Sequence, residues 1–234
     1  MHKISYLKPL LDKNLRFLYE TISKHLHNLE SLVDTKQIDS YQTDLKAYLN
    51  GYTKKDSLFK DLRKAESFSY PIHTPILLEY AKFKNQYIIN NKLKTLDDLY
   101  YYCKHTSTLS FLLLICGEDF LKPLELINDV AQVDVLTDIL TNFQVLQKKG
   151  DINFPLALIN DYDIDFTLEG NYLLNAKFIA MWDMLAYKVF MLIQNLSSKL
   201  HLFEDTHQLI LKEFLKDIKQ TLMNFEKTVI KINR

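Results

Sequence analysis

The sequence has few of the residues that turn or break a chain. Only 4 glycines and 5 prolines occur among its 234 residues. Sandwiches and barrels need a turn every few residues, so this scarcity argues against them and favours long helices. Apolar residues recur at intervals of three and four, as on one face of a helix, and no segment predicts a strand. We therefore predict an all-α fold in which residues 1–234 form one domain.

The chain also lacks an excess charge and a disulfide framework. Its 29 Lys and Arg residues equal its 29 Asp and Glu residues, whereas a general nucleic-acid binder carries a positive excess. We therefore expect no nucleic-acid partner. The two cysteines, Cys103 and Cys116, are too few for a disulfide scaffold. Both are predicted to be core residues of a protein in a reducing compartment.

No long apolar run is present. The longest, Leu109–Cys116, is interrupted by Ser110, and it is far below the roughly 20 residues that span a bilayer. The first residues, Met1–Leu11, have no apolar stretch typical of a secretory signal. We expect a cytoplasmic protein without a transmembrane segment, and peripheral contact with a membrane stays open.

Apolar spacing and turn residues predict where the helices begin and end. Thr95 with Asp98 three residues later resembles a capping box. It opens a helix that we expect to run to Cys116, before Gly117. The other predicted helices cover residues 8–33, 39–49, 57–67, 76–90, 121–148, 155–160, 171–200 and 205–232.

Two segments resemble the squalene/phytoene synthase family. Leu136–Leu156, LTDILTNFQVLQKKGDINFPL, resembles the second aspartate-rich segment of that family. Thr95–Ser110, TLDDLYYYCKHTSTLS, resembles a segment that lies upstream of it, and Tyr41–Gly51 is a weaker third match. The resemblance covers residues 20–230. It implies a single-domain helical bundle of the isoprenoid synthase type and, for an active member, head-to-head joining of prenyl diphosphates.

The residues that the family chemistry needs are largely replaced. In the family, two aspartate-rich motifs hold Mg²⁺, which binds the diphosphate and stabilises its departure. The two aspartate positions of the second motif hold Asn142 and Leu146, and its two arginine positions hold Thr141 and Asp151. An aspartate where a cation belongs would repel diphosphate. The resemblance thus implies a degenerate member that needs no cofactor, with Mg²⁺ required only if it is active.

Two acidic pairs are the candidate metal ligands. Glu30 and Asp34 resemble the family's first motif and are four residues apart, which would place them on one helical face. The alternative is a pair of solvated residues near a helix end. Asp134 and Asp138 have the same spacing. For them, a displaced metal site competes with a solvated or lysine-paired face.

The candidate substrate-binding residues follow from the resemblance and are Tyr102, Ser107, Thr108 and Asn142. In the ungapped register, Phe111 replaces a small residue and would narrow a prenyl cavity. A shift of one residue places Thr106, Ser107 and Ser110 at the small positions, and the cavity survives. The sequence leaves both registers open.

Three hypotheses for function remain. The first is a degenerate family member that binds an isoprenoid, another lipid or a protein partner. The second is an active transferase for farnesyl or geranylgeranyl diphosphate with a rebuilt metal site. The third is an unrelated helical scaffold.

Overall fold

The computed structural model describes residues 11–52, 57–68, 74–90, 93–115, 123–148, 154–167 and 173–232. Helices dominate these residues and none of them forms a strand, so the all-α prediction is confirmed. The chain divides into two compact units. Unit 1 contains the described residues of Lys92–Ser107 and Asn128–Arg234, and unit 2 contains those of Ser5–Asn91 and Thr108–Ile127. The expectation of one domain over residues 1–234 stays a prediction.

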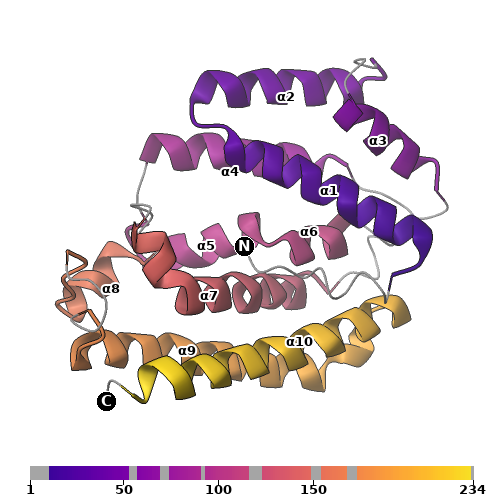
Figure 1. Cartoon of the computed structure of the whole chain (residues 1–234). Coiled ribbons are helices and arrows are strands. Elements are labelled where there is room, and N and C mark those ends of the chain that lie inside the picture. The colour runs from indigo at the N-terminus through magenta and orange to yellow at the C-terminus, as the bar shows by residue number, and fades with distance from the viewer. Residues whose placement is uncertain are drawn as a thin grey trace. The chain divides into compact units, whose positions relative to one another are not determined.

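Unit 2 is built around its first helix. Contacts join α1 to α3, α4 and α6, and α2 packs on α4 (Figure 1). The inward face of α1 carries large aliphatic residues every three or four positions, and each of Leu15, Leu18, Ile22 and Leu26 is almost fully buried. The bounds are α1 Lys13–Ser31, α2 Thr35–Leu49, α3 Ser57–Glu66, α4 Ile76–Asn90 and α6 Thr108–Ile115.

Unit 1 contains the longest helix, α7, which belongs to it from Asn128 onward. Buried apolar residues lie on every side of this helix, as in a helix enclosed by protein. Figure 1 shows α9 and α10 running side by side along their length. The bounds are α5 Leu96–Thr106, α7 Leu124–Lys148, α8 Leu156–Asp161, α9 Ala176–Ser198, η4 Leu200–Leu202, α10 Asp205–Phe225 and η5 Glu226–Ile230.

Polar and aromatic contacts attach α9 to α7. The indole Nε1 of Trp182 donates a hydrogen bond of 3.0 Å to the carbonyl of Leu140. The rings of Phe143 and Phe178 are 4.6 Å apart between centroids. Because a buried indole N–H needs a partner, this bond and the ring packing together fix the rotation of α9 against α7.

The prediction of one helix from Thr95 to Cys116 is wrong. The helix ends at Thr106, Ser107 has an extended backbone, and α6 begins at Thr108. Serine and threonine hydroxyls compete with helical hydrogen bonds and therefore favour helix ends. Here the Ser107 hydroxyl bonds to a side chain on another helix, as described below. Cys116 lies outside the described residues.

The start of α5 is the predicted capping box. The Thr95 hydroxyl accepts from the backbone N–H of Asp98 at 3.2 Å, and the Asp98 carboxylate accepts from that of Thr95 at 2.8 Å. We expect Thr95→Ala to lower the free energy of unfolding by about 1 kcal/mol, measured by urea denaturation. Thr43→Ala, on the exposed face of α2, removes an equal side chain without a cap and should have little effect. An equal loss in both variants would contradict a capping role.

Candidate functional site

A buried carboxyl on α7 is the centre of the candidate site. Asp134 is 6% exposed. The Ser107 hydroxyl at the end of α5 donates to its Oδ2 atom at 2.6 Å, while its Oδ1 atom is buried and accepts no hydrogen bond from the residues that the structure describes. The pKa of Asp134 is raised to about 7, chiefly by burial; the hydrogen bond from Ser107 opposes the rise, and the charge of Asp138 contributes to it. Such a carboxyl takes up and releases its proton near neutral pH.

Cys103 lies one turn before Ser107 and is fully buried. Burial raises the pKa of its thiol, and the negative charge of Asp134 raises it further. The thiol therefore stays protonated and is a poor nucleophile. The prediction that Cys103 is a core residue is confirmed.

Along the next turns of α7, the side chains become progressively weaker ligands for a metal ion. The Asn142 side-chain amide donates to Oδ1 of Asp138 at 2.8 Å. Leu146, one turn further on, has no oxygen in its side chain. The face thus runs from a buried carboxyl through a half-buried carboxyl and an exposed amide to a hydrocarbon.

Hydroxyl groups on α7 are turned back into the helix. Thr137 donates to the carbonyl of Val133 at 2.6 Å, and Thr141 donates to the carbonyl of Thr137 at 2.8 Å. Both bonds satisfy the hydroxyl within its own helix. Thr141 corresponds to an arginine in the resemblance described above. Its side chain has no positive charge, and its hydroxyl is already bonded within the helix.

The first acidic pair does not share a helical face, and this prediction is wrong. Glu30 belongs to the last turn of α1, which ends at Ser31. Asp34 instead caps α2, where its Oδ1 atom accepts from the backbone N–H of Gln37 at 2.9 Å. The chain leaves the helix between the two carboxylates, so a spacing of four residues no longer implies one face.

The remaining predicted residues are placed as follows. Tyr102 is half-buried on α5, whereas Thr108 is buried at the start of α6, in unit 2, and its hydroxyl has no hydrogen-bond partner among the described residues. Ser107 and Ser110 are buried. The side chain of Phe111 lies outside those that the structure describes, so both registers of this segment stay open.

Asp134 and Asp138 do not form the solvated face that the sequence suggested, because Asp134 is buried. Over the described ranges, no three His, Cys, Asp or Glu side chains are grouped closely enough to hold a metal ion. A metal site made by Glu30, Asp34, Asp134 and Asp138 stays a prediction.

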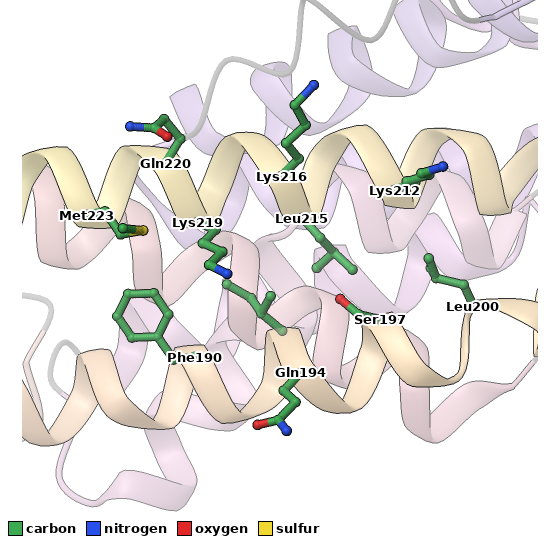
Figure 2. A pocket seen from close by; sticks show the side chains of 11 residues that line it. Phe190, Gln194, Ser197, Leu200, Lys212, Leu215, Lys216, Lys219, Gln220 and Met223 are labelled. Atoms are coloured by element: carbon green, nitrogen blue, oxygen red, sulfur yellow. The ribbon is translucent and has the colours of Figure 1, made fainter.

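A second feature, which the sequence analysis missed, is a groove between α9 and α10 of about 940 Å³. We call it the α9–α10 groove; Figure 2 shows its side chains. The signal was present in the spacing of Lys212, Lys216 and Lys219, which lie on one face of α10. The lining residues are Phe190, Ile193, Gln194, Ser197, Leu200, Lys212, Leu215, Lys216, Lys219, Gln220 and Met223.

Comparison with known proteins finds a similar fold in a solved structure. No model of a protein family matches the sequence, and no curated protein matches it. The structure is similar to that of a dehydrosqualene synthase in complex with ligand, with a TM-score of 0.79 and 14% sequence identity. The match covers 97% of this chain and 82% of that one. The predicted fold class, an all-α bundle of the isoprenoid synthase type, is confirmed.

A helix that spans a bilayer must be both long and apolar. Among the residues that the structure describes, no helix is both long enough and apolar enough to span a bilayer.

Proposed function

We propose that this chain is a squalene/phytoene synthase-like protein that binds a ligand or partner and does not efficiently ionise a prenyl diphosphate. The proposal rests on the side chains that follow one another along α7. Its first carboxyl, Asp134, is buried against Ser107, and its later positions hold Asn142 and Leu146. Asp138 is the one partly exposed carboxylate of this series.

Prenyl transfer depends on neutralising the leaving group. Mg²⁺ does this by binding diphosphate oxygens while carboxylates hold the ion, and it prefers exposed, ionised oxygen ligands. The Asp134 carboxyl has a raised pKa and gives one oxygen to Ser107. A leucine side chain supplies no ligand at all. These features support a structural role for this face of α7.

An isoprenoid, another lipid or a protein is the proposed binding partner, in the cytoplasm and without a metal cofactor. The same fold is used by an enzyme with which it shares a TM-score of 0.79. The second candidate is therefore an active, Mg²⁺-dependent transferase of farnesyl or geranylgeranyl diphosphate. The unbonded Oδ1 atom of Asp134, one turn from Asp138, favours it.

Calorimetry tests the proposal. The protein is titrated with farnesyl thiodiphosphate, a substrate analogue that resists ionisation, in the presence and absence of Mg²⁺. We expect no binding in the micromolar range that depends on Mg²⁺, because the α7 face lacks a set of carboxylates to hold the ion. Micromolar binding that is lost in Asp138→Asn but kept in Asp97→Asn would contradict the proposal and favour the transferase. Asp97 is a matched control because it is an exposed aspartate in the first turn of α5.

A further inference from the structure

The α9–α10 groove has one wall from each of two helices. Phe190, Ile193, Gln194 and Ser197 recur at three- and four-residue intervals and so lie along one face of α9. The facing residues of α10 follow the same spacing, from Lys212 to Met223. This stretch of twelve residues is about 17 Å long. The groove is therefore an elongated trough parallel to both helices.

The interior of the trough combines apolar side chains with a lysine. Lys219 points from α10 into the space beside Phe190 and Leu215 points toward Ser197, whereas Lys216 points away from α9 (Figure 2). Met223 lies at the end near Phe190, and it is 48% exposed. A cation set among apolar groups favours a ligand that carries both a negative charge and a hydrocarbon part.

The charge of the groove is not balanced locally. Lys216 lies 3.7 Å from Glu213, and both side chains are largely open to solvent. Neither Lys212 nor Lys219 forms an ion pair with a residue that the structure describes, and the lining contains no acidic side chain. The complement of this surface is therefore an anion.

Apolar surface continues beyond the lining on the α9 side. Tyr187 and Met191 are 67% and 47% exposed and lie on the same face as Phe190 and Gln194. Exposed large apolar side chains next to a groove mark a binding surface more often than isolated ones do. A hydrocarbon chain would remove part of this surface from water, which favours binding.

The size of the groove favours one of two occupants. A helix of a protein partner is about 10–12 Å across. A volume of about 940 Å³ lies within the roughly 300–1,000 Å³ typical of small-molecule sites. A single-chain molecule therefore fits better than an acidic helix.

We propose that the α9–α10 groove binds a single-chain anionic amphiphile. Its carboxylate or phosphate group bonds to Lys219 with support from Lys212, and its hydrocarbon chain lies along Phe190, Ile193 and Leu215. This site goes beyond the proposed function, because it lies on helices other than the α5 and α7 pair and does not depend on whether the chain is an enzyme.

The test uses dodecyl phosphate below its micellar concentration, measured by calorimetry and by NMR of the methionine methyl groups. We expect saturable binding that moves the signal of Met223, which lines the groove, and leaves that of Met181, which is buried in α9, in place. Inorganic phosphate lacks the chain and dodecyltrimethylammonium lacks the negative charge. Both should bind at least about tenfold more weakly.

Lys219→Glu should weaken the binding of dodecyl phosphate about tenfold or more, because it reverses the charge beside the anionic group. Lys104→Glu makes the same charge change at an exposed position on α5 and should leave binding unchanged. Phe190→Ala should weaken the binding of dodecyl phosphate without affecting that of inorganic phosphate.

Equal binding of dodecyltrimethylammonium, equal effects of Lys219→Glu and Lys104→Glu, or an unmoved Met223 signal would overturn the proposal. Binding only to anionic phospholipid vesicles would also overturn it, and so would binding only to an acidic amphipathic peptide. Each of these results leaves the Mg²⁺ titration unaffected, so a failure at the groove is distinct from a failure of the proposed function.

Discussion

We expect the Asp134→Asn variant to become more stable relative to the unmodified protein as the pH rises. The native carboxyl has a pKa of about 7, whereas an unfolded chain gives aspartate a pKa of about 3.9. Between these values the native state binds more protons than the unfolded state. The stability of the unmodified protein therefore falls as pH rises through this window, by on the order of 4 kcal/mol, and asparagine removes this term.

The quantity to measure is the difference in unfolding free energy between Asp134→Asn and the unmodified protein. Urea denaturation at pH values from about 4 to 8, followed by circular dichroism, gives this difference directly. It should grow with pH in favour of the variant and level off above about pH 7. Asp97→Asn, at an exposed aspartate, should show no such trend.

A difference that does not change with pH would mean that Asp134 is already ionised in the native protein at acid pH. The buried oxygen that lacks a hydrogen bond would then carry a charge, and a cation would be needed to balance it. That outcome would favour the metal-dependent alternative.

Much of the fold could be predicted because its signals are local. The capping box at Thr95 and the apolar spacing of α1 depend on residues close together in the sequence. The break at Ser107 was missed because a serine between Thr106 and Thr108, with no Gly or Pro beside it, is compatible with a continuous helix. What decides the matter is its hydroxyl bond to Asp134, 27 residues away.

The candidate site was predicted less well because burial and helix ends depend on tertiary structure. The spacing of Glu30 and Asp34 fits a shared helix, but Asp34 caps the next one. The apolar neighbours of Asp134 on every side of α7 were a usable sign of burial. The spacing of the lysines on α10 was a usable sign of a basic face, but the α9–α10 groove itself depends on how the two helices pack together.

Catalysis of prenyl transfer is where the largest effect is expected. Each missing group that stabilises transition-state charge commonly lowers the rate by about 10²–10³. Under the proposed relation to the squalene/phytoene synthases, Asn142 and Leu146 would stand at two carboxylate positions of the family pattern, and Thr141 and Asp151 at two arginine positions. Restoring all four positions by Thr141→Arg, Asn142→Asp, Leu146→Asp and Asp151→Arg should raise activity only if the first acidic motif and a prenyl cavity are intact.

Incubation of the unmodified protein with farnesyl diphosphate and Mg²⁺, followed by analysis of the extracted products, tests the non-catalytic function most directly. A dehydrosqualene synthase assayed in parallel shows that the conditions support turnover. We predict that no head-to-head product forms above the level in a reaction without protein. Robust formation of such a product, abolished in Asp138→Ala and kept in Asp97→Asn, would contradict the proposal and establish an active transferase.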